Sequence, residues 1–252
     1  MRASLSPLAA VEARRLLTHP ILLMGAALSA FAIAFSVQRE GQLQSFLLMG
    51  LAILPLALGT FVAANQAALR SRRDRAEELL DTLPQDARTR TGAQLLAVLA
   101  ALPIAFALLA AAYLLFGAAD GLVISAVGAR REPAVVELLQ GPLLVLALGA
   151  LGVLLGRIAP VTPLALLLVV AVVVIEVPLA AWTPETQWRW VVPLVNNMIA
   201  VPDGWTQCEP RMNRDCGIVE RFDTVAMAWH LVALAIVTAA ASAAALAAGR
   251  RD

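Results

Sequence analysis

The sequence predicts an all-α integral membrane protein, built as a single transmembrane permease-like domain over residues 1–252. Of these residues 60% are hydrophobic and 15% are charged, and the mean hydropathy is +0.79. A soluble domain usually has about a quarter of its residues charged. The surplus of Leu, Ala and Val falls in blocks near bilayer length, which indicates membrane-spanning helices rather than one soluble core.

Six segments reach the roughly 20 mostly apolar residues that a transmembrane helix needs. Pro55 and Pro103 fall inside two of them, and neighbouring helices can satisfy the carbonyls that such prolines leave free. The fourth segment is least clear at its start, which contains a Glu and a Gln, and its Gly152 and Gly156 have a spacing that permits close helix packing. The segments are 20–37, 46–69, 92–116, 134–156, 161–181 and 226–248.

The distribution of arginine predicts the orientation of these segments. All 19 basic residues are arginine, a bias that we attribute to a GC-rich bacterial genome. Cytoplasmic loops carry the excess of basic residues. With the N-terminus inside, the inner short segments hold 12 arginines and the outer short loops hold 3. We therefore expect a multi-pass protein of the bacterial cytoplasmic membrane with both termini in the cytoplasm, segment 72–90 inside and loop 182–225 outside.

Residues 5–19 precede the first apolar segment and predict a short helix on the inner membrane surface. Ser6 followed by Pro7 gives an N-cap and a proline at the first helical position. The apolar residues of this stretch share one face, which Glu12 interrupts. The alternative is a plain extension of the first span.

Segment 72–90, RRDRAEELLDTLPQDARTR, is the most highly charged stretch of the chain. Four of its apolar side chains recur at i, i+3, i+4 and i+7, which places them on one face of a helix. Pro84 ends this helix, because the residue before a proline is disfavoured in the helical region. The segment predicts a cytoplasmic helix that docks on another protein, and the alternative is a solvated loop. The face consists of Ala76, Leu79, Leu80 and Leu83, with an i,i+4 pair of Arg73 and Glu77 on its flank.

Loop 182–225 is long for a connection, and long loops usually have a function or structure of their own. Four of the five tryptophans lie in it, and tryptophan gathers at membrane interfaces. Its apolar stretch 191–201 is too short to span and suits an interfacial or re-entrant helix. We expect this loop to cover the outer end of the protein.

Cys208 and Cys216 lie in the same loop. Two cysteines this close in an oxidising compartment predict a disulfide that closes a small loop, and the alternative is two free thiols. A metal site is not expected, because His19 and His230 fall on opposite membrane faces and two sulfurs alone do not complete a zinc site. His230, beside Trp229, is expected at the interface.

Polar residues within spans are functional candidates by default. Glu176 lies near the outer end of the fifth span. It is predicted either to face a translocation path, together with Asn196 and Asn197 of the outer loop, or to reach the outer interface. Asn65 and Gln66 approach the inner end of the second span and are predicted to form interhelical hydrogen bonds.

Several catalytic motifs are absent. The chain has no lysine and therefore no phosphate-binding lysine of the P-loop kind, and it contains neither HExxH nor GxSxG. Its net charge of +1 gives no field that would attract nucleic acid. We expect a non-enzyme without a cofactor of its own, whose energy comes from another protein.

Three motifs together resemble one family. They are EARRLLTHP at 12–20, RAEELLDTLP at 75–84, and WHL at the start of the last span. With six spans and a structured outer loop, the chain resembles the permease subunits of type-2 ABC transporters, mostly exporters. The family usually shows GTLE ahead of the leucines, where this chain reads DRAEELL.

The resemblance implies a working unit of two permeases, copies or paralogues, and two separately encoded ATPase subunits that bind ATP and Mg²⁺. Segment 72–90 is then the coupling helix between spans two and three, which docks in a groove on the ATPase. Leucines would be its apolar anchors and charged residues its rim contacts. The expected coupling residues are Arg73, Glu77, Glu78, Leu79, Leu80, Asp81 and Leu83.

The expected cargo is an amphipathic or lipid-like substrate or a drug that leaves the cell, with membrane lipid around the spans. One alternative is a membrane assembly factor of the haem-export and cytochrome-maturation kind, and another is a secondary carrier that needs no ATPase. An ATPase with Walker motifs encoded next to this chain would separate the first reading from the last.

If the disulfide is present, Cys208 and Cys216 resist alkylation in protein taken from the oxidising compartment and become reactive after reduction. Mass spectrometry after alkylation with and without reductant measures this. Free thiols in the unreduced sample would contradict the prediction.

Overall fold

Helices form most of the part of the chain that the computed structural model describes, and each of the six apolar segments is helical over most of its described residues. The described residues are 2–38, 51–73, 87–118, 122–123, 130–131, 135–159, 162–182, 199–200, 221–222 and 224–249. The helices are α1 (Arg2–Leu17), α2 (Pro20–Gln38), α4 (Leu54–Arg73), α6 (Ala87–Val98), the 3₁₀ turn η1 (Leu99–Ala101), α7 (Leu102–Ala118), α8 (Val135–Ile158), α9 (Thr162–Trp182) and α10 (Thr224–Ala248).

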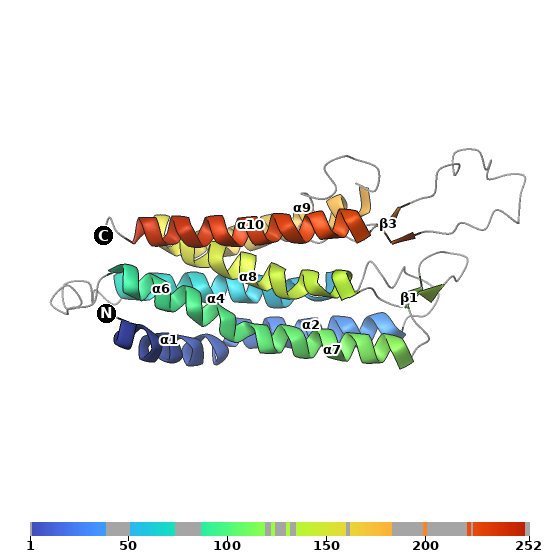
Figure 1. Ribbon diagram of the computed structural model, residues 1–252, viewed down its shortest axis with the longest axis horizontal. Coiled ribbons are helices and arrows are strands. Elements are labelled where there is room, and N and C mark those ends of the chain that lie inside the picture. The colour runs from blue at the N-terminus through green and yellow to red at the C-terminus, as the bar shows by residue number, and fades with distance from the viewer. Residues whose placement is uncertain are drawn as a thin grey trace, which may run out of the picture.

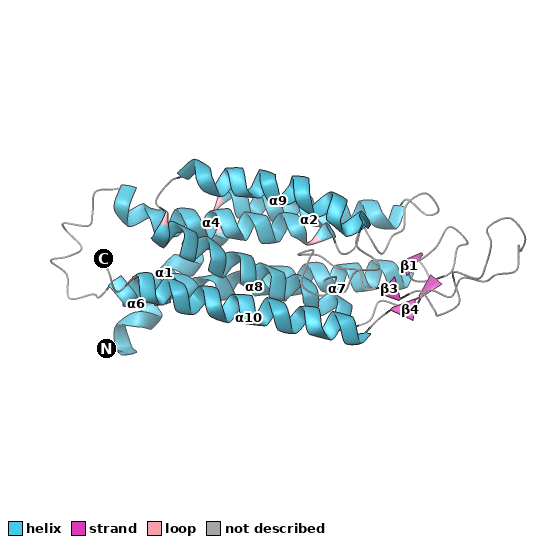
Figure 2. Ribbon diagram, turned by 90° about the horizontal axis from the view of Figure 1, so that it is seen from above, coloured by secondary structure: helices cyan, strands magenta, loops and turns pink. Residues whose placement is uncertain are grey.

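Six helical rods run along the long axis of the molecule in alternating directions: α2, α4, the combined α6–η1–α7, α8, α9 and α10 (Figure 1). We call one end of this bundle the basal end. There α1 begins, α4 and α10 end, and α6 begins (Figure 1). The distal end lies opposite, where two short strand pairs are seen (Figure 2). Both ends of the described chain therefore lie at the basal end.

The strand pairs are small antiparallel ladders. β1 (Leu122–Val123) pairs with β2 (Arg130–Arg131), and β3 (Ile199–Ala200) pairs with β4 (Arg221–Phe222). The second pair joins two distant points of loop 182–225, with Ile199 opposite Phe222. The sequence pattern did not predict either pair, because two residues are too few to show an alternation of polar and apolar positions.

Three of the described helices are long and apolar enough to cross a membrane: Ala87–Ala118, Val135–Ile158 and Thr224–Ala248. A fourth candidate arises if Leu5–Leu17 and Pro20–Phe35, which meet at a bend of 57°, are counted as one span. This fold is that of an all-α protein compatible with a membrane. The predicted total of six spans stays a prediction.

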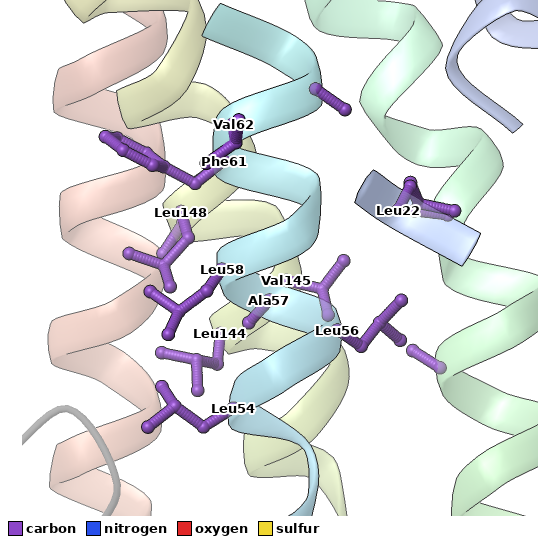
Figure 3. Close-up of a cluster of buried hydrophobic side chains, with 14 of the residues drawn as sticks. Leu22, Leu54, Leu56, Ala57, Leu58, Phe61, Val62, Leu144, Val145 and Leu148 are labelled. Atoms are coloured by element: carbon purple, nitrogen blue, oxygen red, sulfur yellow. The ribbon is translucent and has the colours of Figure 1, made fainter. Parts of the chain in front are cut away.

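α4 lies at the centre of the bundle, packed against α2 on one side and α8 on the other. Residues 56–65 of α4 are all buried. Figure 3 shows Leu58 and Phe61 of α4 turned to the same side as Leu148 of α8. A helix that is buried all round needs no amphipathic stripe, so the sequence pattern alone could not have marked α4 as central.

Small residues let the backbones of these helices approach closely. A side chain at Gly59 would meet the carbonyl oxygen of Ile21 at 2.9 Å, and one at Gly25 would meet the carbonyl oxygen of Pro55. On the other side of α4, Gly152 lies against the carbonyl of Phe61 and Gly156 against Ala68. The close packing that the Gly152 and Gly156 spacing predicted is thus confirmed, with α4 as the partner helix.

The start of α4 is completed by a side chain from α2. The first N–H groups of a helix have no intrahelical acceptor, and Pro55 in this first turn has no N–H to satisfy. The N–H of Leu56 does need an acceptor, and it donates to Oγ of the fully buried Ser29 at 3.0 Å. The pair α2–α4 is therefore held by a hydrogen bond as well as by packing.

Pro103 explains the 3₁₀ turn η1 within the longest helical rod. Proline has no N–H, so the carbonyl of Leu99 cannot receive the usual bond from residue 103. Instead the N–H of Leu102 donates to the carbonyl of Leu99, which is the i to i+3 bond of a 3₁₀ turn. The proline is accommodated by tightening one turn, and the helix continues on both sides.

α1 differs from its prediction at one point. It begins at Arg2 rather than at a Ser6 cap, and Pro7 lies inside it. Pro7 removes only the bond to the carbonyl of Ala3 in the first turn, so the helix tolerates it close to its end.

Replacing Gly152 by Ala should destabilise the protein, because the new Cβ would collide with the backbone carbonyl of Phe61, which cannot swing away as a flexible side chain could. We expect a loss of about 1–3 kcal/mol, typical of overpacking, seen as a lower melting temperature in detergent.

The matched control is Gly117→Ala on α7, where a Cβ would meet nothing within 4 Å. That change should leave the melting temperature unchanged or raise it, because Ala has the higher helix propensity. Equal melting temperatures for the two variants would contradict the proposed α4–α8 contact.

Candidate functional site

The residues predicted for coupling to an ATPase fall at or beyond the edge of the described chain. Arg73 is the last residue of α4 and only its backbone is described, and the remaining coupling residues lie outside the described residues. Those remaining residues are Glu77, Glu78, Leu79, Leu80, Asp81 and Leu83.

The side chains of the other predicted site residues also lie outside the described part of the structure. Glu176 lies on α9, where only its backbone is described. Asn196, Asn197, Cys208 and Cys216 lie outside the described residues. The translocation path and the disulfide therefore stay predictions.

The described helix ends that flank 74–86 do form a site. α4 ends and α6 begins beside α1, and α8 and α10 end close by. The polar side chains of α1, the α1–α2 bend, α4, α6 and α8 at this end interact across helices, and we call them the basal junction. Its members are Glu12, His19, Asn65, Gln66, Arg70, Gln94 and Arg157.

Gln94 on α6 joins three helices with one side chain. Its Nε2 donates to the carbonyl of Ala67 on α4 at 3.1 Å. Its Oε1 accepts a bond from Nη2 of Arg157 on α8 at 3.0 Å. Both ends of the amide are thus used, and α6 cannot slide along α4 or α8 without breaking one of these bonds.

The burial of Arg157 makes its bond to Gln94 important. Arg157 is only 7% exposed and lies in the last turn of α8, where a positive charge is favourable beside the helix C-terminus. A buried charge that loses a partner costs far more than an exposed one, because the group has already given up its water.

α1 is fastened to α4 by charge. Glu12 on α1 is 13% exposed, and its carboxylate lies 3.1 Å from Arg15 of the same helix and 3.8 Å from Arg70 of α4. Such partly exposed pairs typically contribute less than about 1 kcal/mol each. This contact therefore orients α1 against the end of α4 and does not stabilise the fold strongly.

His19 sits at the bend between α1 and α2. Its Nδ1 accepts from the N–H of Ile21 at 3.3 Å, so Nε2 bears the proton and donates to Oε1 of Gln66 on α4 at 3.2 Å. This arrangement assigns the neutral Nε2–H tautomer. The ring caps the start of α2 and ties the bend to α4.

Asn65 is fully buried between α4 and α8. Its Nδ2 donates to the carbonyl of Gly152 at 3.4 Å, a long bond that the absence of a side chain at Gly152 makes possible. The interhelical hydrogen bond predicted for Asn65 is therefore confirmed, whereas Gln66 bonds His19 in the bend between α1 and α2.

The described charged side chains at the basal end are mostly basic, while the adjoining segment 74–86 adds five acidic residues and one arginine in sequence. Within the described part of the chain, the charged side chains there are one glutamate, Glu12, and six arginines. The arginines are Arg14, Arg15, Arg70, Arg88, Arg90 and Arg157.

A second group of buried polar residues lies toward the distal end. Glu137 and Gln140 in the first turns of α8 are buried, and His230 on α10 is 1% exposed. The predicted position of His230 at the membrane interface stays a prediction; its side chain faces the bundle, whereas its neighbour Trp229 is 58% exposed. Adjacent helix positions point about 100° apart, so one faces the bundle and the other faces outward.

A scan against protein-family models finds no match for this chain, and a search of curated proteins finds no significant match either.

The chemistry available at the basal junction is binding and mechanical connection. Among the described residues no group of three or more His, Cys, Asp or Glu side chains could hold a metal ion. The junction contains guanidinium, amide, imidazole and carboxylate groups that are engaged with one another across helices. These contacts connect the ends of α4 and α6 to α1, to the bend between α1 and α2, and to α8.

The bond between Gln94 and Arg157 is testable with a double-mutant cycle. Gln94→Leu and Arg157→Leu should each destabilise the protein, and together they should cost less than the sum by about 1.5–3 kcal/mol, the range for hydrogen bonds to charged groups. Unfolding in a mild detergent measures the four stabilities.

Arg14 on the exposed side of α1 provides the control. Gln94→Leu combined with Arg14→Leu should be additive within about 0.5 kcal/mol. Additivity in the Arg157 cycle as well would mean that the two side chains do not interact in the membrane protein.

Proposed function

We propose that this chain is the transmembrane permease subunit of an ATP-driven ABC exporter of type 2, with segment 72–90 as the coupling helix. The supporting observation is the basal junction. The two helices that flank 74–86 are each connected to other helices: α6 to α4 and α8 through the two hydrogen bonds of Gln94, and α4 more weakly to α1 through Arg70 and Glu12.

This fastening suits a protein that is pushed from outside. A force applied to 74–86 reaches the described chain at the end of α4 and the start of α6. Because both are tied to further helices, the force displaces the junction as a unit and the bundle repacks in steps, since packed helices are bistable rather than elastic. If the two helix ends had no such contacts, the same force would move the segment without displacing the rest of the bundle.

The proposed source of the force is a separate ATPase dimer. ATP and Mg²⁺ are bound by that partner and not by this chain. When the ATPase closes, it carries the coupling helix with it, through Leu79, Leu80 and Leu83 as apolar anchors and Arg73, Glu77, Glu78 and Asp81 as rim contacts.

A second permease, a copy or a paralogue, completes the proposed unit. The cargo path lies between the two permeases, with Glu176, Asn196 and Asn197 as candidate contacts. An amphipathic or lipid-like cargo fits the apolar surface that α9 exposes over its described side chains, where Leu167 and Val170 face outward. The site of action is the bacterial cytoplasmic membrane, with both termini in the cytoplasm.

Substitutions on the leucine face of segment 72–90 test this proposal. Leu79→Asp together with Leu83→Asp should abolish co-purification of the ATPase in mild detergent and reduce transport to background, because two anchors would become charged. Pull-down and cargo efflux from cells or vesicles measure the two effects.

Thr82→Asp together with Gln85→Asp adds the same two charges to the same segment away from the leucine face. This control should keep ATPase association. The coupling assignment is wrong if the leucine double variant still binds the ATPase and transports, and a secondary carrier is favoured if it transports without any ATPase present.

A further inference from the structure

An apolar groove lies between α4, α8 and α9. Its walls include Phe61 of α4, Leu151 and Leu155 of α8, and Val169 and Val172 of α9, and all of its lining residues are Leu, Ile, Val or Phe. Its volume is about 310 Å³. Phe61 and Leu148, which border it, point to the same side of the α4–α8 pair in Figure 3.

The groove exists because α9 packs loosely. This helix runs along one flank of the bundle (Figure 2). Over its described side chains only Ala165 is fully buried, while Leu167, Val170 and Val174 are more than half exposed. Leu168, Val169 and Val172 of α9 line the groove, and this helix has no glycine that would allow closer backbone contact.

The position of the groove along α8 places it within one leaflet of the membrane. Its α8 wall runs from Leu148 to Ile158, which is about 15 Å at 1.5 Å per residue. That is half of the roughly 30 Å thickness of the hydrocarbon core. The wall ends at the last residue of α8, so the groove occupies the half of the membrane next to the basal end.

We propose that this groove binds one acyl chain of an anionic phospholipid from the leaflet at the basal end. At about 30 Å³ for each water-sized group, its volume admits on the order of ten methylene groups. Purely apolar walls cannot retain water, which needs two or more polar partners. A hydrocarbon chain restores the dispersion contacts that an empty groove would lack.

The positive charge at the basal end determines which lipid headgroup is favoured. A lipid whose chain lies in the groove has its headgroup at the level where α8 ends. The sequence segments that form or adjoin this end, 2–19, 70–90, 157 and 250–252, hold 12 arginines and seven acidic residues, a net charge of +5. Arginine binds phosphate in a fork of N–H donors, and juxtamembrane basic clusters attract anionic lipids. An anionic headgroup is therefore favoured over a zwitterionic one, whether or not the chain is a permease.

The test uses phosphatidylglycerol with a photoreactive diazirine in its acyl chain, incorporated into vesicles with the full-length protein. The wild type should be labelled on residues 148–158 and 168–172, and unlabelled phosphatidylglycerol should compete. Val172→Trp, which fills the groove, should lower this labelling at least fivefold. Val174→Trp, two residues away on the exposed face of the same helix, should leave it unchanged.

Four results would overturn the proposal. They are labelling of the wild type that unlabelled lipid does not reduce, equal labelling by the phosphatidylcholine analogue, equal labelling of both tryptophan variants, and a dimer that Val172→Trp dissociates while the wild-type groove is unlabelled. The last result would assign the groove to a second copy of the chain. If Val172→Trp fails to fold, competition by unlabelled phosphatidylglycerol in the wild type still tests whether the groove binds this lipid.

Discussion

The bundle depends on α4 being approached, backbone to backbone, by α2 and α8. Between helices in lipid there is no hydrophobic driving force, so association rests on close packing and interhelical hydrogen bonds. Gly59 of α4 lets α2 approach closely, and the Oγ of Ser29 can then accept from the N–H of Leu56. Gly152 of α8 allows the same close approach on the other side, where Asn65 donates to a carbonyl of α8. The central helix can therefore be one of the more polar ones, because its neighbours shield it.

The polar residues at the basal end set the position of each helix along its axis. Apolar packing between aliphatic helices tolerates small sliding movements, whereas an amide such as Gln94 satisfies Ala67 and Arg157 together in only one register. The junction is thus stiff where the chain enters and leaves segment 74–86. In the same half of the bundle α9 is loosely held, and the groove lies beside it. Tightly bonded and loosely packed helices therefore lie side by side in this half of the bundle.

Much of the helical content could be predicted from the sequence, because six apolar blocks of near-bilayer length leave few alternatives. Close packing at Gly152 and Gly156 was predicted from their spacing, but not that α4 is the partner helix. The bonding of Asn65 and Gln66 was predicted from polar side chains at the end of an apolar segment. The central place of α4 could not be predicted, since burial on all sides leaves no periodic signal. Gln94 and Arg157 were missed because their partners lie 27 and 63 residues away. The burial of His230 was not foreseen, because a single polar residue beside Trp229 gives no sign of which helix face it occupies.

The 3₁₀ turn before Pro103 has a geometric consequence for the rod that follows segment 74–86. Three residues of α-helix turn through about 300°, and three residues of 3₁₀ helix turn through about 360°. α7 is therefore rotated by about 60° relative to a continuous α-helix, and it lies about 1.5 Å farther along the axis. α6 contacts α1, α4, α8 and α10, whereas α7 contacts α2 and α8. The phase offset thus falls where the rod exchanges α1, α4 and α10 for α2 while it keeps its contact with α8.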